Sequence, residues 1–156
     1  MISSSAFALA ICLSIISNNY STFQVKRACK MMPYIVEQSS VYGVDPILVA
    51  SIIEIESSWN PKSVSNKGAC GLMQVVPKWN PSPSGKKYTC EQLKEPKLNI
   101  KVGIRALSRW QKAAKGDTSL TLCAYNAGNV CFTRIRTKYY RKVEEAYLRI
   151  ISTIPL

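Results

Sequence analysis

The sequence contains no histidine, which removes the commonest general base and the commonest metal ligand from consideration. Acidic residues are also scarce, with 9 Asp and Glu against 21 Lys and Arg. Few side chains can therefore act as a general acid or base, and each carboxylate has to be considered individually. The six cysteines form no C-x-x-C pair, which argues against a zinc site, and we expect neither a metal nor a cofactor.

The net charge of +12 predicts an anionic partner, such as nucleic acid, lipid headgroups or an acidic cell-wall glycan. A basic cluster near the C-terminus contains Arg134, Arg136, Lys138, Arg141 and Lys142. It has no nucleic-acid-binding motif and few stacking aromatics, so we interpret it as a solvated face attracted to an anionic envelope rather than to nucleic acid.

The 156 residues suffice for one domain with a core but not for two domains of usual size. The apolar run at 6–16 is shorter than the about 20 residues that a membrane-spanning helix needs. We expect residues 1–20 to be a secretory signal peptide or a short hydrophobic N-terminal segment, and residues 24–156 to be the folded domain. No Lys or Arg precedes the run and no A-x-A site follows it. A retained weak anchor and a buried N-terminal helix therefore remain alternatives.

Removal of that segment would leave five cysteines and hence one unpaired thiol. A disulfide between Cys70 and Cys90 is the pairing we predict, because it closes the Pro-, Ser-, Gly- and Lys-rich loop between them. Such a loop closure stabilises a fold by roughly 3 kcal/mol. The alternative is that the cysteines are buried free thiols.

Helical patterns dominate the rest of the chain, so the predicted fold class is mainly α, one compact lobe with little β-structure. The expected helices cover residues 24–42, 47–57, 96–115, a segment beginning at 120–125, and 134–151. Gly43 and Gly116 end two of them, and Asp45-Pro46 provides a cap and a first-turn proline. Residues 71–76 are expected to form a short strand or a tight helical turn, and residues 77–89 a loop.

Two glutamates, Glu54 and Glu56, lie two residues apart in the otherwise apolar stretch "IIEIESSWNP". Two residues along a helix correspond to a rotation of about 200°, so the two carboxylates cannot share one cleft. The helical neighbours that precede Glu56 are Ile53, Ile52 and Val49, whereas those that precede Glu54 are smaller and more polar. Periodicity therefore places Glu56 on the core face, near the end of the helix.

At that position both desolvation and the helix dipole raise the pKa of the Glu56 carboxyl. A carboxylic acid that stays protonated near neutral pH is what general acid catalysis requires. The alternative from periodicity alone is a solvated Glu56 that turns outward or caps the following turn. Ser57 is expected to hydrogen-bond the helix end and support the site.

Residues 56–77 read "ESSWNPKSVSNKGACGLMQVVP", with a Glu-Ser pair, an aromatic-Asn-Pro turn, a Gly-Ala pair and a Gly-Leu-Met-Gln run. This pattern resembles the catalytic core of the soluble lytic transglycosylase family. "EPKLNIKVG" at 95–103 is similar to a later family segment, with Glu95 in place of the family's Asp. "AYNAG" at 124–128 and "YYRKVEEAY" at 139–147 resemble two further motifs in the family's order.

The resemblance implies a lysozyme-like α-helical fold and cleavage of the MurNAc-GlcNAc bond of peptidoglycan with formation of 1,6-anhydromuramyl ends. It implies that Glu56 is the catalytic residue and that Tyr139, with Tyr140 as the fallback, holds its carboxyl. The positions that match the family's sugar-binding residues are Ser65, Met73, Gln74, Tyr125, Asn126 and Tyr139. Met73 as core filling and Asn126 as part of a helix-terminal turn are the structural alternatives.

A second catalytic carboxylate is not evident, although ordinary glycosidases place two about 5 to 9.5 Å apart. Asp45 lies roughly 16 Å from Glu56 along the helix. The other candidates lie in loops or on the last helix: Glu91, Glu95, Asp117, Glu144 and Glu145. The family resemblance implies that Glu56 acts first as acid and then as base.

Two other functions remain open: a hydrolase similar to goose-type lysozymes, which share "GLMQ" and "AYNAG", and a non-catalytic cell-wall-binding assembly protein. The expected partners are peptidoglycan glycan strands and an envelope-spanning secretion, conjugation or phage assembly. We expect a monomer that is exported to the periplasm or cell envelope, or associated with a virion.

Overall fold

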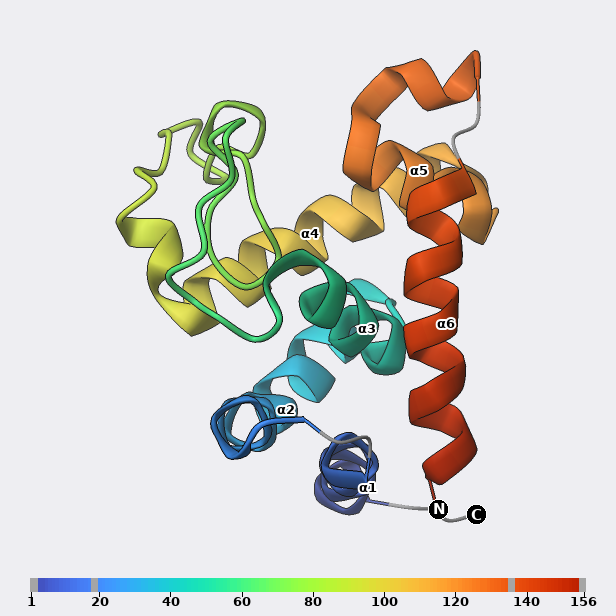
Figure 1. Cartoon of the computed structure of the whole chain (residues 1–156). Helices are drawn as coiled ribbons and strands as arrows, with labels where there is room; N and C mark the ends of the chain where they lie inside the picture. Colours follow the sequence, from blue (N-terminus) through green and yellow to red (C-terminus); the bar gives the residue numbers. More distant parts are fainter. Residues whose placement is uncertain (1–2, 18–19, 135–136, 155–156) are drawn as a thin grey trace.

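Six α-helices make up most of the protein in the computed structural model, which describes residues 3–17, 20–134 and 137–154 (Figure 1). They are α1 (Ser4–Ser17), α2 (Thr22–Tyr42), α3 (Pro46–Ser57), α4 (Pro96–Ala113), α5 (Thr118–Ala127) and α6 (Thr137–Thr153). Three short 3-10 helices are η1 (Pro77–Trp79), η2 (Gln92–Lys94) and η3 (Gly128–Phe132). The only β-pairing in the described residues consists of isolated bridges, so the predicted mainly α fold is confirmed.

Local sequence signals explain where most helices begin. The Asp45 side chain accepts a hydrogen bond from the Ile47 backbone N–H at 2.8 Å, and Pro46 occupies the first turn, as predicted. Helix α2 begins two residues earlier than expected, because Ser21 and Gln24 form a capping box. Helix α6 begins at Thr137 rather than at 134; residues 135 and 136, including Arg136 of the basic cluster, lie outside the described residues.

Helix α3 is buried on nearly all sides, because it packs between α2 and α6 (Figure 1). Val49, Ile52 and Ile53 belong to the core, and so do Ala50 and Ser51 on the Glu54 side. Ser51 satisfies its hydroxyl by donating to the Ile47 carbonyl at 2.8 Å. Both glutamates therefore sit on a helix with no broad solvent-exposed face.

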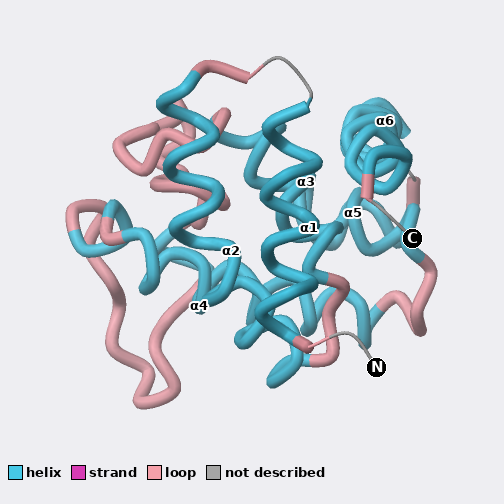
Figure 2. The backbone as a smooth tube through the Cα atoms, turned by 90° about the horizontal axis from the view of Figure 1, so that it is seen from below, coloured by secondary structure: helices cyan, strands magenta, loops and turns pink. Residues whose placement is uncertain are grey.

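Helix α1 lies beside α2 and also contacts α6, so one face of the N-terminal helix packs against the rest of the structure (Figure 2). Ala8, Ile11 and Ile15 are buried at helical spacing, and Ser14 donates a hydrogen bond to the Ile150 carbonyl of α6 at 2.6 Å. In the part of the chain that the structure describes, no helix is both long and apolar enough to cross a membrane. Removal of residues 1–20 as a secretory signal stays a prediction.

All six cysteines are paired, as Cys12–Cys29, Cys70–Cys90 and Cys123–Cys131. The predicted Cys70–Cys90 disulfide is confirmed. The free-thiol alternative is wrong for this chain. The expectation of one unpaired thiol applies to a chain without residues 1–20 and stays a prediction, since removal of Cys12 on α1 would leave Cys29 of α2 without its partner.

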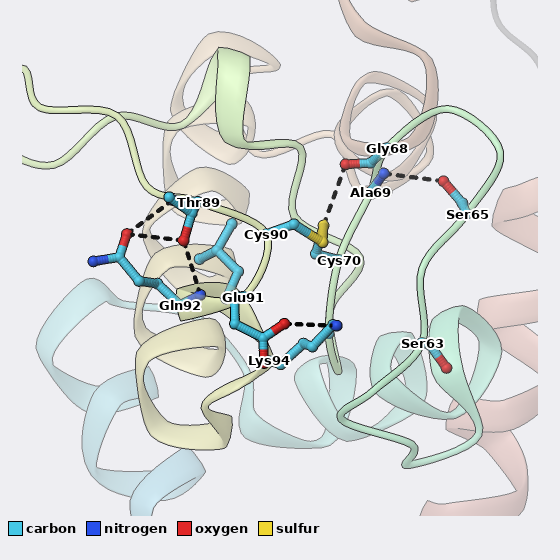
Figure 3. The surroundings of a disulfide bond; sticks show 12 residues. Ser63, Ser65, Gly68, Ala69, Cys70, Thr89, Cys90, Glu91, Gln92 and Lys94 are labelled. Atoms are coloured by element: carbon cyan, nitrogen blue, oxygen red, sulfur yellow. Dashed lines mark hydrogen bonds and ion pairs between the residues drawn. A yellow bond between two sulfur atoms is a disulfide. The ribbon is translucent and has the colours of Figure 1, made fainter.

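The long connection between α3 and α4 folds back on itself without a strand or helical turn at 71–76. The Cys70 and Val75 backbones exchange two hydrogen bonds of 3.0 Å, which closes a tight turn. The Cys70–Cys90 disulfide then ties this turn to the segment before η2 (Figure 3). A pair of backbone hydrogen bonds and a disulfide thus fix a loop that has little regular secondary structure.

Candidate active site

Glu56 lies in the last turn of α3, partly buried, and its Oε1 accepts a hydrogen bond of 2.7 Å from the Tyr139 hydroxyl. Burial raises the pKa of the Glu56 carboxyl above its ordinary value, and the Tyr139 hydrogen bond partly opposes that rise. The carboxyl is thus largely removed from solvent and bonded to Tyr139 of α6 rather than turned outward. Its environment favours the protonated acid while still offering a donor to the carboxylate.

The chain leaves Glu56 through two consecutive residues in the left-handed conformation, Ser58 (φ 49°) and Trp59 (φ 63°). Trp59 is fully buried, and two side chains of α2 hold this turn: Gln24 donates to the Ser58 carbonyl and Arg27 donates to the Trp59 carbonyl. Such strain persists only where surrounding contacts impose it, and it concentrates at functional sites. The turn therefore fixes the position of the Glu56 backbone.

Ser57 donates its hydroxyl hydrogen to the Ile53 carbonyl at 3.1 Å, which confirms the expected support of the helix end. Glu54, by contrast, forms an ion pair with Arg149 of α6. Only 12% of the Glu54 side chain is exposed, so its carboxylate is also removed from most of the solvent. The two glutamates are distinguished by their partners, a cation for Glu54 and a neutral phenol for Glu56.

Tyr125 from the "AYNAG" motif lies between Glu56 and the loop after α3. Its hydroxyl donates to the Met73 carbonyl at 2.8 Å. Burial raises the pKa of Tyr125 well above its ordinary value, and the nearby Glu56 charge adds to this effect. Tyr139 shows the same direction, again because of burial and then Glu56. Both phenols thus remain protonated and can act as hydrogen-bond donors near Glu56.

The prediction that the Met73 side chain contacts sugar needs correction, because that side chain is fully buried. It packs against Gly103 of α4, where an added Cβ would lie 2.5 Å from the Met73 sulfur. The absence of a side chain at Gly103 therefore makes room for Met73. Only the backbone of Met73 faces functional groups, through the hydrogen bond that its carbonyl accepts from Tyr125.

Asn99 is a positioning residue to which sequence reasoning assigned no role, although "EPKLNIKVG" contains it. Its buried amide accepts from the Met73 N–H and donates to the Cys70 and Leu93 carbonyls, each at 2.7 Å. A side chain at Gly71 would collide with this amide. Asn99 thus fastens the loop to α4. Glu95, which departs from the family's Asp, still caps α4 by accepting from the Lys97 and Leu98 N–H groups.

Ser65 and Gln74 both shape the loop. Ser65 accepts a hydrogen bond of 3.3 Å from the Lys67 backbone N–H and one of 3.0 Å from the Ala69 backbone N–H. Figure 3 shows the bond from Ala69. Gln74 has a left-handed backbone (φ 49°), and its amide donates to the Ser63 and Gly71 carbonyls. Tertiary contacts therefore hold both side chains in place.

A cavity of about 970 Å³ runs between this loop, α4, and the end of α5 with η3. Gln74, Tyr125 and Asn126 line it, whereas the remaining predicted site residues do not. The cavity also continues to Trp79, Arg109 and Trp110, which sequence reasoning did not identify. The sequence signal that could have pointed to Trp79 is a tryptophan at the start of a Pro-rich loop. The structure shows that its side chain is exposed.

None of the nine acidic residues, all of them within the described part of the chain and Glu56 included, is among the residues that line this cavity. Asp45 and Glu95 cap helices, as does Asp117. Glu91 pairs with Lys94, and Glu144 accepts a hydrogen bond from Tyr140, which is the tyrosine that does not contact Glu56. Glu56 is thus the acidic residue with an environment suited to proton transfer.

Comparisons with known proteins agree with this geometry. Residues 33–148 match the family described as "Transglycosylase SLT domain". The endo-type membrane-bound lytic murein transglycosylase A of Klebsiella pneumoniae subsp. pneumoniae is 40% identical over 95 residues, which are 54% of this chain and 44% of that protein. The protein of the same name from Salmonella paratyphi B is 39% identical over 94 residues, with the same coverage of 54% and 44%. The chain thus spans less than half the length of these relatives.

Among solved structures, an inactive mutant of lytic transglycosylase Slt from Pseudomonas aeruginosa aligns with 93% of this chain and 26% of its own, with a TM-score of 0.62. At 21% identity this similarity concerns the fold. Since the family match covers most of the sequence, from α2 to α6, this chain belongs to the transglycosylase SLT domain family.

Proposed function

We propose that the protein is a peptidoglycan lytic transglycosylase, which cleaves the β-1,4 bond between MurNAc and GlcNAc and leaves 1,6-anhydromuramyl ends. The observation that carries this proposal is the largely buried Glu56 carboxyl with a raised pKa and a phenol donor, near a cavity whose lining contains no carboxylate. Family membership and the names of the relatives support the same reaction class.

In the first half of the proposed reaction, protonated Glu56 donates its proton to the glycosidic oxygen as the bond from that oxygen to C1 of MurNAc breaks. The GlcNAc hydroxyl leaves, and positive charge develops at C1 and the ring oxygen. The N-acetyl oxygen of the same MurNAc stabilises this charge. Burial of Glu56 assists the step, because it raises the pKa and so increases the fraction of protonated acid at a given pH.

In the second half, the C6 hydroxyl of MurNAc attacks C1, and the Glu56 carboxylate takes the hydroxyl proton. A 1,6-anhydro ring forms, Glu56 returns to its protonated state, and no water is consumed. The Tyr139 hydroxyl stabilises the intermediate carboxylate, because it donates to Oε1 at 2.7 Å. One residue thus performs both proton transfers. Gln74, Tyr125 and Asn126 are proposed to bind the sugars from the cavity wall.

Product analysis tests this proposal directly. Purified peptidoglycan is digested with the protein and with its Glu56→Gln variant, and the muropeptides are analysed by mass spectrometry. Anhydro products, which are one water lighter than hydrolysed products, are expected from the unmodified protein only. Reducing muramic ends alone would instead assign the scaffold to a hydrolase.

We also propose that the protein acts in the cell envelope, where its substrate lies. The three disulfides support this location, because such bonds persist in oxidising compartments. Opening the wall for a secretion, conjugation or phage assembly is the proposed context. Intact-mass measurement of protein recovered from the envelope would show whether residues 1–20 are retained.

A further inference from the structure

The cavity extends well beyond the residues that matched the family motifs. Gln74 and Tyr125 line it, and Tyr125 is close enough to Glu56 for the glutamate charge to raise the tyrosine pKa. Trp79, Arg109 and Trp110 line the same cavity. A glycan strand placed at Glu56 and running along this cavity would therefore reach a second group of side chains.

Trp79 is the most conspicuous member of that group, because 67% of this large apolar side chain is exposed. The Lys78 ammonium lies 4.7 Å from the centre of its rings, and Trp79 also lines the cavity. A flat aromatic surface in a groove suits the C–H face of a pyranose ring, since it offers a large contact area with few degrees of freedom to lose.

The segment that carries Trp79 is held firmly against α4. The Asn80 amide donates to the Val76 carbonyl at 3.0 Å, and its oxygen accepts from the Arg109 guanidinium at 2.8 Å. Arg105 donates to the Pro81 carbonyl. Two arginines one helical turn apart thus anchor the loop around η1, and a contact surface that is ordered in advance costs less to bind.

The other wall of the cavity is fixed by separate means. Trp110 contacts Phe132 of η3, with ring centroids 6.2 Å apart, and both lie beside the Cys123–Cys131 disulfide. A small apolar cluster of Cys123, Ala124 and Cys131 forms here, apart from the main core. Figure 1 shows the loop and η3 rising on either side of α4. Both walls are therefore rigid.

The polar residues that line the cavity also fit a peptidoglycan strand. The charged side chains that line the cavity are Lys67 and Arg109, both basic, while the carboxylates of muropeptides are anionic. Asn126 and Asn129 provide exposed amides that can hydrogen-bond acetamido groups and hydroxyls. The mixture of aromatic, amide and basic groups is one that N-acetylated, acidic glycans require.

We propose that Trp79, together with Arg109 and Trp110 of the same cavity lining, forms a further saccharide-binding subsite, where an N-acetylhexosamine ring stacks on Trp79. The inference rests on the proposed function in that the ligand is the same glycan strand. Its consequence is that affinity increases with the number of sugar rings, because a longer strand contacts Trp79 as well as the residues that match the family motifs.

The test is calorimetric titration of the protein with an N-acetylglucosamine hexasaccharide, in the Glu56→Gln background so that no cleavage occurs. Trp79→Ala is expected to weaken hexasaccharide binding by roughly tenfold, as for the loss of one central aromatic contact. Trp79→Phe, which keeps an aromatic face, should retain most of the affinity.

Phe23→Ala is the matched control. Phe23 is also 67% exposed and also lies under a cation, with the Arg27 guanidinium 4.4 Å from its ring centre, but it is on α2 and does not line the cavity. It should leave hexasaccharide affinity unchanged. Thermal unfolding of each variant controls for folding. If Trp79→Ala unfolds early, Trp79→Leu replaces it, because leucine keeps an apolar side chain without an aromatic face and should lose a similar share of the affinity.

Unchanged hexasaccharide affinity in Trp79→Ala, equal loss in Phe23→Ala, or absence of hexasaccharide binding by the parent would each overturn the subsite. These outcomes are separate from the product assay. Trp79-dependent binding without anhydro products would leave the subsite standing and reject the ring-closing reaction. Anhydro products with Trp79-independent binding would do the reverse.

Discussion

The two faces of α3 carry the same functional group in different electrostatic settings. Glu54 forms an ion pair with Arg149, whereas Glu56 accepts a hydrogen bond from Tyr139, a neutral donor, in a largely buried environment. Both partners come from α6, Tyr139 from its first turn and Arg149 from its C-terminal half. Both carboxyl groups are mostly removed from solvent, so the difference between the two lies in the partner that α6 supplies, and burial raises the pKa of Glu56 beside a phenol.

The largest effect is expected from Glu56→Gln, which retains the shape of the side chain and removes its titratable proton. Activity should fall by roughly a hundredfold to ten-thousandfold, the range typical of a lost general acid. Release of anhydromuropeptides measures it, and Glu54→Gln is the matched control. Clearing of cell walls that survives Glu56→Gln but is lost in Glu54→Gln would reverse the assignment of the two faces.

The same variant should become more stable at neutral pH. Because the folded-state pKa of Glu56 lies above its unfolded value, its contribution to stability is complete below the unfolded pKa and is lost as pH rises through the folded pKa. Glutamine does not ionise and escapes that loss. Denaturant unfolding at acidic and neutral pH should show the variant's advantage at neutral pH only; an advantage independent of pH would contradict it.

The double substitution Cys12→Ser and Cys29→Ser removes the disulfide that joins α1 to α2. Helix α1 supports the end of α6 that carries Arg149, because Ser14 donates a hydrogen bond to the Ile150 carbonyl there. Loss of this disulfide should lower the free energy of unfolding by roughly 3 kcal/mol. Activity of the folded protein should persist, because Tyr139 lies at the opposite end of α6. Loss of activity at temperatures where the variant is fully folded would contradict this expectation and show that the two ends of α6 are coupled.

Tyr139→Phe removes the donor to Glu56 and leaves the ring in place. Because the lost hydrogen bond lowers the Glu56 pKa, the pKa should rise, and the decline of activity with increasing pH should move to higher pH. The maximal rate should fall by roughly tenfold, as for one hydrogen bond to a charged group. Tyr140→Phe, which affects a hydroxyl bonded to Glu144, is the control. An unshifted pH profile would contradict the role of Tyr139.

The smallest effect is expected from Glu54→Gln, which weakens the ion pair but can keep a hydrogen bond. Arg149 is about half exposed, so solvent screens the pair and the loss of stability should be about 1 kcal/mol. The pKa of Tyr20, which burial and then Glu54 raise to about 12, should move toward its ordinary value. Spectrophotometric titration of the tyrosines reports it, and an unchanged Tyr20 pKa would show that burial alone is responsible.

Much of the fold was predictable because its signals are local. Asp45-Pro46 and Gly43 marked helix boundaries correctly, and apolar spacing identified α3 and α4. The packing of α1 could not be predicted, since an apolar helix of this length suits a leader and a core equally well. The pairing of Cys12 with Cys29 was therefore not predicted, since it requires α1 to pack against α2.

The candidate site was also predictable only in part. The motifs indicated Glu56, Tyr125 and Tyr139 because their types and order are distinctive, but they also suggested Met73, whose side chain lies in the core. Asn99 was missed because its role depends on buried hydrogen bonds between segments distant in sequence. Trp79 was missed because it lines a cavity that forms only when the loop, α4 and the end of α5 with η3 come together.

The sequence by itself determined that this protein is mainly helical, that Glu54 and Glu56 point to different sides of one helix, and that few groups can transfer protons. Those properties follow from periodicity, capping residues and composition, which act over a few residues. Tertiary structure alone decided which carboxyl meets a cation and which meets a phenol. That choice depends on where α6 lies against α3, about 80 to 100 residues away in the chain, and no local pattern records it.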